Sequence, residues 1–260
     1  MAALSAVILL GSGAAYADQR DDFIAGTTKD CPKCDLTGVN KKRANLAGAN
    51  LAGATLTNAD FHNVNLQGAD LTGADLTGAN LNIADLRNAK LPGAKLDNVM
   101  LYGARAGRAD LSDVTMIGVM AGKADFTGAK LTNVKLGNGD LEQATLQRAD
   151  LSGSDLTGST FSEANLQAVD FTGARVTDAM MTFTLLRGAN FSKATATGTD
   201  FYQADMREVT LGDADFSNSR LLQADLDPAL LQGVGLNNTI MPDGTVNNPA
   251  TPGAPATPAK

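Results

Sequence analysis

Tryptophan is absent from the 260 residues, aromatic residues make up only 5% of the chain, and cysteine and histidine are scarce. There are two cysteines, Cys31 and Cys34, and a single histidine, His62. A zinc site of the common kind needs four ligands, which this set does not supply. His62 stands in no recognisable motif with a serine or cysteine nucleophile. We therefore expect no catalytic residue, no metal site and no cofactor, and the chain is predicted not to be an enzyme.

No hydrophobic run reaches the roughly 20 residues that a membrane-spanning helix needs. A short apolar stretch at residues 4–10 is followed by Ala15-Tyr16-Ala17, a small-x-small pattern typical of a signal-peptidase site. No lysine or arginine precedes this stretch, so a plain apolar N-terminus is the alternative. We interpret residues 1–17 as a signal peptide and residues 18–30 as an N-terminal lead-in. The mature chain is then exported without a membrane span, first of all to a periplasm, with the thylakoid lumen or the cell exterior as alternatives.

What the sequence has in abundance is a period of five. Between positions 36 and 241 every fifth residue is Leu, Phe, Met, Val or Ala, with Lys41 as the only exception. An α-helix turns about 100° per residue, so this period would spread the apolar column around the whole helix. A flat strand alternates faces with period two, so successive members of the column would point to opposite sides. The chain must therefore coil around its own apolar residues.

The unit around each of these central residues has a recurring composition. The residue two places before is small from position 39 onward, and glycine often stands two places after, where tight turns need a positive φ. Residues 69–73 and 74–78 both read Ala-Asp-Leu-Thr-Gly. This pattern resembles the pentapeptide-repeat family. The resemblance implies an all-β fold, a right-handed quadrilateral β-helix with four pentapeptides per turn. Residues 31–241 would then form about ten coils, stacked about 4.8 Å apart.

The two ends of the repeat region differ from its middle. Residues 242–260 hold five of the eight prolines among Asn, Thr, Ala and Gly, and we predict a disordered tail because this composition cannot pack a core. At the other end, Cys31 and Cys34 fall on the repeat register and could both point into the first coil. We interpret them as a structural disulfide or a pair of buried thiols, in preference to redox or metal chemistry. An exported compartment favours the disulfide.

Several positions that should face solvent carry large apolar residues instead of polar ones. On a four-sided coil most of them fall on one side and its adjoining corners, and a contiguous apolar patch indicates an interaction surface. They are Ile83, Met100, Tyr102, Ile117, Met120, Met180, Phe183, Leu185, Tyr202 and Leu222. We predict that this face binds an unidentified protein or envelope component, or a second copy of the chain. The predicted function is that of a non-enzymatic, exported structural or protein-binding scaffold.

The alternative function comes from the resemblance, since some family members are acidic rods that imitate DNA and bind type II topoisomerases. Such mimicry needs uniform stripes of negative charge. The net charge here is only −7, and the signs alternate on one predicted side, which at twenty-residue steps reads Asp70, Lys90, Asp110, Lys130, Asp150 and Asp170. We keep DNA mimicry of this kind as the alternative and do not expect nucleic acid as a partner.

A third hypothesis is ice or polysaccharide binding by ladders of hydroxyl groups. One predicted corner column carries Ser112, Thr132, Ser152, Thr172 and Ser192. Serine and threonine are common turn residues, so we favour an ordinary role in the turns.

Overall fold

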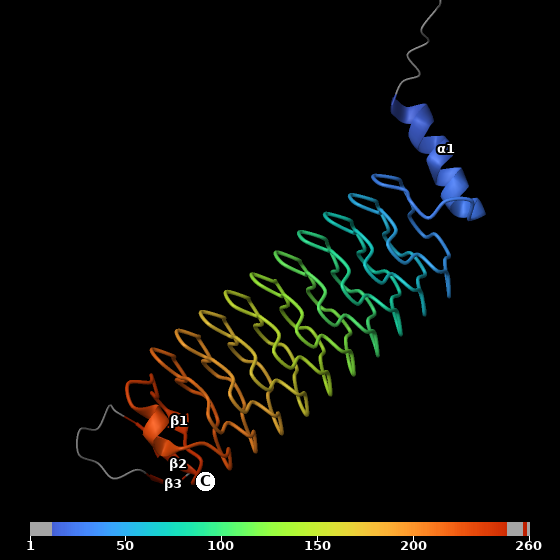
Figure 1. Cartoon of the computed structure of the whole chain (residues 1–260). Coiled ribbons are helices and arrows are strands. Elements are labelled where there is room, and N and C mark those ends of the chain that lie inside the picture. The colour runs from blue at the N-terminus through green and yellow to red at the C-terminus, as the bar shows by residue number, and fades with distance from the viewer. Residues whose placement is uncertain (1–11, 249–256, 259–260) are drawn as a thin grey trace, which may run out of the picture.

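The structure, a computed structural model, describes residues 12–248 and 257–258 and shows a long rod of stacked coils (Figure 1). Helix α1 (Ser12–Ala25) stands at the N-terminal end of the rod. A 3₁₀ helix, η1 (Pro228–Leu231), lies at the other end. It is followed there by three short strands, β1 (Thr239–Ile240), β2 (Thr245–Asn247) and β3 (Thr257–Pro258).

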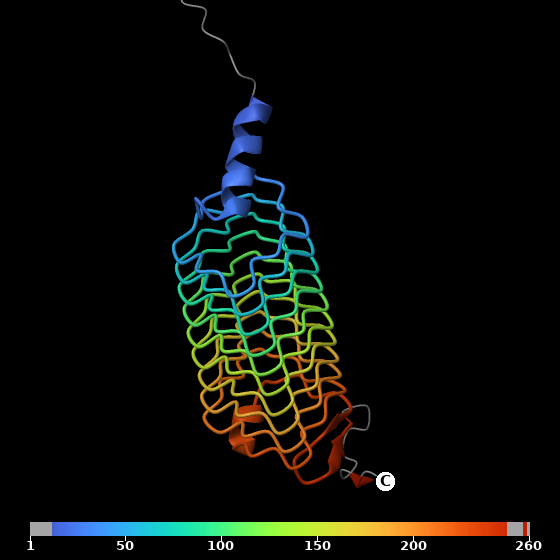
Figure 2. The ribbon, with the colours of Figure 1, turned by 90° about the vertical axis from the view of Figure 1, so that its right-hand side faces the viewer.

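Each turn of the coil takes twenty residues. Parallel bridges join residues twenty apart, from Asp35 and Thr55 at the start to Arg220 and Ile240 at the end. Because bridges recur at every fifth residue, each turn has four sides, and the chain is a right-handed quadrilateral β-helix, as predicted. Figure 2 shows the coils stacked along the rod. Each side is so short that it makes one bridge rather than an extended strand.

The corners between the sides are tight turns. The N–H of Ala54 donates to the carbonyl oxygen of Leu51 at 3.1 Å, and Gly53 between them has a φ of 65°. A positive φ at the third residue alone defines a type II turn, which favours glycine or asparagine there. Ile83 and Phe183 adopt the same left-handed conformation, with φ of 59° and 58°. This conformation is uncommon for large side chains and above all for a β-branched one.

Aspartate or asparagine before the central residue holds the turn that follows. The N–H of Thr72 donates to Oδ1 of Asp70 at 3.0 Å, and the side chain and backbone of Thr72 together lower the pKa of Asp70. In the predicted hydroxyl ladder the side chains are engaged in the same way. The hydroxyls of four of its members donate to the side chain two residues earlier, namely those of Ser112, Ser152, Thr172 and Ser192. These hydrogen bonds agree with an ordinary role of the hydroxyl groups in the turns.

The core is the column of central residues, flanked by the small ones. Leu151 is fully buried and Ala149 is almost so. The C-terminal half is widened by phenylalanine, and the rings of Phe171 and Phe191 stack with 4.7 Å between centroids. Buried small polar residues donate to backbone carbonyls, either of a neighbouring coil, as Ser154 does to Leu131 at 2.8 Å, or of their own coil, as Thr184 does to Met181 at 2.7 Å. In the described part of the chain no buried side-chain nitrogen or oxygen lacks a partner.

Helix α1 closes the N-terminal end of the core, since its Phe23 is fully buried and belongs to the same hydrophobic cluster as the first coil. The helix runs across the predicted cleavage position between Ala17 and Asp18. The apolar stretch at residues 4–10 lies outside the described residues, so the signal peptide stays a prediction. Within residues 12–248 and 257–258, no helix combines the length and apolar character needed to cross a membrane.

At the C-terminal end the repeat gives way to a cap. Asp227 begins η1 by accepting the N–H of Ala229 at 2.9 Å. Strands β1, β2 and β3 then form one antiparallel sheet in that order. Residues 245–247, which fall within the predicted disordered tail, thus pair as β2 with the last coil, because an open coil end leaves backbone groups available for a strand. Residues 249–256 and 259–260 lie outside the described part.

Candidate partner-binding face

The predicted binding residues lie on one side of the rod and on the corners beside it. We call this the methionine side, because its bridged column contains Met100, Met120 and Met180. The corner that follows this column holds Ile83, Tyr102, Phe183, Tyr202 and Leu222. Ile117 lies on the corner before the column, and Leu185 lies on the next side, bridged to Asn165. The twenty-residue turn therefore aligns on one corner residues from several different coils.

The ten residues form two groups rather than the single continuous face that the sequence predicted. The first apolar cluster consists of Ile83, Met100, Tyr102, Ile117 and Met120. The second apolar cluster consists of Met180, Phe183, Leu185, Tyr202 and Leu222. Two polar coils separate them, because Met120 bridges Asp140 and Met180 bridges Thr160. We call these two coils the acidic gap, since their exposed residues on this side include Asp140, Glu142 and Glu163.

The clusters leave a large part of their apolar surface free. Seven of the ten side chains are exposed, from 41% for Leu185 to 51% for Ile83. Met100, Tyr202 and Leu222 are half-buried rather than exposed. The outward orientation predicted from the repeat therefore agrees with the structure, while three residues offer less surface than expected.

Aromatic contacts organise the second cluster. The rings of Phe183 and Tyr202 meet edge to face, with 5.5 Å between centroids. The guanidinium of Arg220 lies 4.3 Å from the centroid of Tyr202 and 3.2 Å from a carboxylate oxygen of Asp200. These contacts hold the rings in one orientation, so little side-chain freedom remains to be lost when a partner binds.

The first cluster adjoins a shallow depression at the start of the acidic gap. The N–H of Tyr102 donates to Oδ1 of Asn82 at 2.9 Å, and the ammonium of Lys123 lies 5.8 Å from its ring centroid. Gly122 has no side chain, which leaves a hollow of about 270 Å³ lined by Tyr102, Gly122, Lys123, Asp140, Glu142 and Gln143. Apolar, cationic and acidic groups thus meet at one place.

The other predicted residues lie away from this side. Cys31 and Cys34 are buried in the first coil and are joined in a disulfide, with their Cα atoms 5.4 Å apart. His62 is half-buried at a corner, where its backbone N–H donates to Oδ1 of Asp60 at 3.3 Å. Among the described residues no group of three His, Cys, Asp or Glu side chains is arranged to hold a metal ion.

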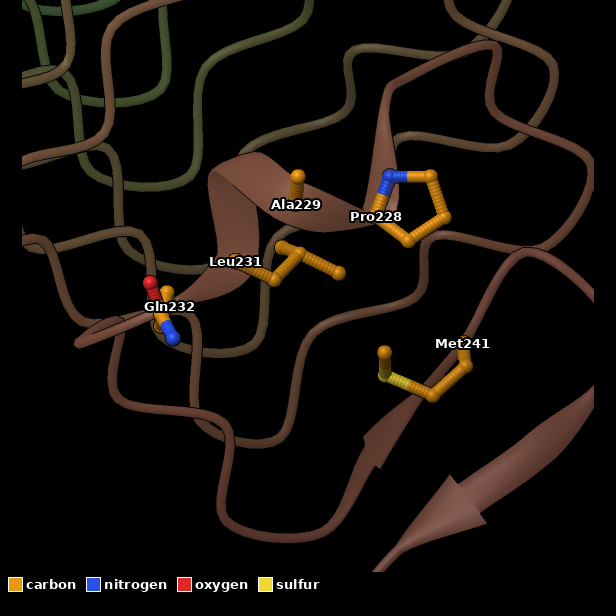
Figure 3. A pocket seen from close by; sticks show the side chains of 5 residues that line it. All are labelled: Pro228, Ala229, Leu231, Gln232 and Met241. Atoms are coloured by element: carbon orange, nitrogen blue, oxygen red, sulfur yellow. The ribbon is translucent and has the colours of Figure 1, made fainter.

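Sequence reasoning missed one apolar depression, at the C-terminal end of the rod. It has a volume of about 440 Å³ and is lined by Pro228, Ala229, Leu231, Gln232 and Met241 (Figure 3). Pro228 could have indicated this depression from the sequence, since it interrupts the repeat and starts η1. The depression carries no charged side chain.

The fold defines a class of protein, a β-solenoid with a filled core, which here carries exposed apolar residues on its outside. Sequence comparison is specific about the family. Pentapeptide repeats match in eight copies over residues 44–82 and 79–118, and a pentapeptide repeat region matches over residues 124–201. Together these matches cover more than half of the chain, which therefore belongs to the pentapeptide-repeat family. A comparison with curated proteins gives no match.

Solved structures of the same fold are similar to the chain. HetL, a pentapeptide repeat protein involved in heterocyst differentiation regulation in the cyanobacterium Nostoc, is 24% identical, with a TM-score of 0.61 over 86% of this chain and 96% of its own. A pentapeptide repeat protein from the Arabidopsis thaliana thylakoid lumen is 31% identical over 41% of this chain and 71% of its own, with a TM-score of 0.37. QnrB1, a plasmid-mediated fluoroquinolone resistance protein, is 20% identical over 62% of this chain and 89% of its own, with a TM-score of 0.31.

Proposed function

We propose that the chain is a non-enzymatic, exported scaffold that binds a partner protein through the methionine side. The observation that carries this proposal is the pair of exposed apolar clusters at positions that the repeat usually fills with polar residues. Methionine and aromatic residues are enriched in the cores of protein interfaces, and a few such residues usually carry most of the binding energy. The core of the rod is filled by side chains, since every central residue from Leu46 to Leu226 is buried, and this leaves little room for a small substrate inside it.

Two members of the clusters stand where the repeat itself favours other residues. Ile83 and Phe183 occupy the left-handed turn position, which Asn fills at residues 58, 63 and 88. A large side chain costs about 1–2 kcal/mol in this conformation relative to glycine. Both side chains are also about half exposed, so burial in the rod does not offset that cost. Burial against a partner supplies a reason for keeping them.

The acidic gap indicates what kind of partner fits. The two clusters extend over equal numbers of coils on either side of the gap, so two copies could pair antiparallel with unlike clusters in contact. The two-fold axis would then run through the gap and would bring the coil of Asp140 and Glu142 in one copy opposite the coil of Glu163 in the other. Like charges facing each other oppose association. A different protein, with basic residues between two apolar anchors, complements the surface better than a second copy does.

Removing negative charge from the acidic gap tests this assignment. The change should shift the affinity for a basic partner protein and the affinity for a second copy of the chain in opposite directions. In Glu142→Gln/Glu163→Gln, binding of a basic partner should weaken, whereas self-association should strengthen. The partner is first captured by photo-crosslinkers at positions 120 and 180, and the proposal requires the same protein at both. Its affinity for wild type and variant is then measured, and light scattering reports the oligomeric state.

A second variant removes the apolar anchors. Tyr102→Asn/Phe183→Asn/Tyr202→Asn should abolish capture of the partner and leave the melting temperature nearly unchanged, because the three side chains lie outside the core. A matched control, Thr72→Asn/Thr132→Asn/Thr172→Asn, makes the same number of changes on a corner that does not adjoin the methionine side and should bind normally. Undiminished capture by the aromatic variant, or stronger self-association of the neutralised variant, would overturn the proposal.

DNA mimicry is the alternative that we do not favour. Bridges align Asp70, Lys90, Asp110 and Lys130 in one column, and Asp85, Arg105 and Asp125 in another, so the signs alternate along both. Phosphate-like stripes require one sign throughout. A DNA supercoiling assay with a type II topoisomerase separates the two functions, since the scaffold proposal predicts no effect of the purified rod.

A further inference from the structure

Half of the arginines lie on one of the four corners. Five of the ten are Arg87, Arg108, Arg148, Arg187 and Arg207, and Gln67, Gln147 and Gln167 accompany them. Backbone hydrogen bonds run along this corner from coil to coil, for example from the N–H of Arg108 to the carbonyl of Thr127 (3.0 Å) and from the N–H of Arg148 to the carbonyl of Gln167 (3.0 Å). We call it the arginine corner. It is separated from the methionine side by one whole side of the rod.

The arginine corner contains two similar depressions. One, of about 260 Å³, is lined by Gln67, Arg87, Asn88, Gly107, Arg108 and Thr127. The other, of about 270 Å³, is lined by Gln147, Arg148, Gln167, Ala168, Arg187, Gly188 and Glu208. Each combines two arginines, at least one glutamine and a glycine, whose missing side chain opens the hollow.

The arginines differ in how they are already engaged. Arg87 and Arg207 each bind the aspartate two residues earlier with two hydrogen bonds, and Arg187 binds Glu208. Arg108 and Arg148 are exposed, and their guanidinium groups form no hydrogen bond or ion pair with the described residues. One unengaged arginine therefore borders each depression.

Carboxylates border the arginine corner on both flanks. Asp85, Asp125 and Asp205 lie on the side before it, and Asp110, Asp150 and Asp170 on the side after it. The same columns also contain Arg105, Lys90 and Lys130, but a wide polyanion such as a nucleic-acid duplex would still meet these carboxylates as well as the arginines. A single narrow chain that carries a few carboxylates would meet the arginines alone.

We propose that the arginine corner is a binding site for an acidic segment of a partner protein, with one carboxylate on Arg108 and another on Arg148. Guanidinium binds a carboxylate through two parallel hydrogen bonds, and this geometry requires an arginine whose donors are free. The amides of Gln147 and Gln167, which are bonded to each other at 3.0 Å, retain a donor and an acceptor for the backbone of the segment. This site does not depend on the methionine side.

The spacing of the two arginines indicates the sequence of the segment. Arg108 and Arg148 are two coils apart, which is about 10 Å along the rod. In polyproline II conformation a chain rises about 3.1 Å per residue with three residues per turn, so residues i and i+3 share a face about 9 Å apart. An acidic-x-x-acidic segment in this conformation presents two carboxylates at the required distance.

A synthetic peptide tests the site directly. The probe is fluorescein-labelled Pro-Glu-Pro-Pro-Glu-Pro, and its binding to the full chain is measured by fluorescence anisotropy at low and at physiological salt. Arg108→Gln/Arg148→Gln should weaken binding at least tenfold. Glutamine is compatible with the backbone there, since Gln143 and Gln203 already adopt the same positive φ.

Matched controls separate the arginine corner from a general charge effect. Arg43→Gln/Lys193→Gln removes two positive charges from the same turn position on other corners and should change affinity less than twofold. The same peptide with glutamine in place of glutamate should not bind. Absence of binding by the wild-type chain, equal binding by the two protein variants, or preference for a single-stranded DNA probe over the peptide would each overturn the proposal.

Discussion

Lys41, the only charged residue in the central column, lies over the ring of Phe23 from helix α1, with its ammonium 4.9 Å from the ring centroid. The same ammonium donates to the carbonyl of Ile24 at 3.1 Å. Lysine at this position binds a carbonyl near the C-terminal end of α1, where the helix leaves backbone oxygens unpaired. This exception to the apolar column therefore marks the place where a different element packs against the rod.

Phe23→Ala should detach α1 and expose the first coil. We expect a loss of about 3 kcal/mol, typical of a buried phenylalanine, that is confined to the N-terminal end because each coil contacts only its neighbours. Hydrogen exchange checks this, with faster exchange near Cys31 and unchanged protection near Leu151. Ile24→Ala is the control, since that side chain is 45% exposed. Uniform loss of protection along the rod would contradict this account.

Inward and outward positions should respond very differently in the middle of the rod. Leu151→Asp places a charge in a fully buried column and should cost roughly 3–5 kcal/mol. Asp150→Ala removes the acceptor for the N–H of Ser152 and should cost about 1 kcal/mol or less. Thermal melts of the two variants measure the contrast, and equal losses would mean that the assignment of core and surface is wrong.

Replacing the two cluster residues that have a left-handed backbone, Ile83 and Phe183, should increase the stability of the rod. Ile83→Asn and Phe183→Asn should each stabilise the rod by up to about 1 kcal/mol, because asparagine tolerates a positive φ better than a bulky side chain. Ile117→Asn changes an equally exposed side chain whose φ is not positive and should bring no gain. Chemical denaturation measures all three. A stabilised variant that no longer binds the partner would connect the strain to function.

Stability should fall at acidic pH through the turn carboxylates. Hydrogen bonds from the side chains of Arg87 and Arg207 lower the pKa values of Asp85 and Asp205 below the ordinary aspartate value of 3.8. A lowered pKa in the folded state means that these groups stabilise the rod above about pH 4 and lose that contribution as pH falls through the folded-state pKa. The melting temperature should thus hold from pH 7 to 5 and drop below 4. In Asp85→Asn/Asp205→Asn the drop should be smaller, and an unchanged pH profile would contradict the assignment.

The two ends of the mature chain can be checked by mass spectrometry. We expect the exported protein to begin at Asp18, which leaves Phe23 in place as the cap of the first coil. Cys31 and Cys34 should resist alkylation until they are reduced, since they are buried and joined in the structure. An intact Met1, or two cysteines that alkylate without reductant, would count against export to an oxidising compartment.

Sequence alone determined the coil and its core, because a period of five leaves a short-sided coil as the only regular way to keep every central residue inside. The tight turns at the corners followed from glycine two places after the central residue, and the two cysteines fell in register. Export and the partner could not be derived in this way, since neither depends on the repeat.

Only the tertiary structure decided how the surface is divided. The split into two clusters depends on which residues stack at twenty-residue distance, so that Asp140 follows Met120 in the same column. The half-burial of Tyr202 depends on Arg220, one coil away. These are contacts between coils, whereas the pentapeptide pattern specifies each coil from within, and that difference limits what the pattern can predict.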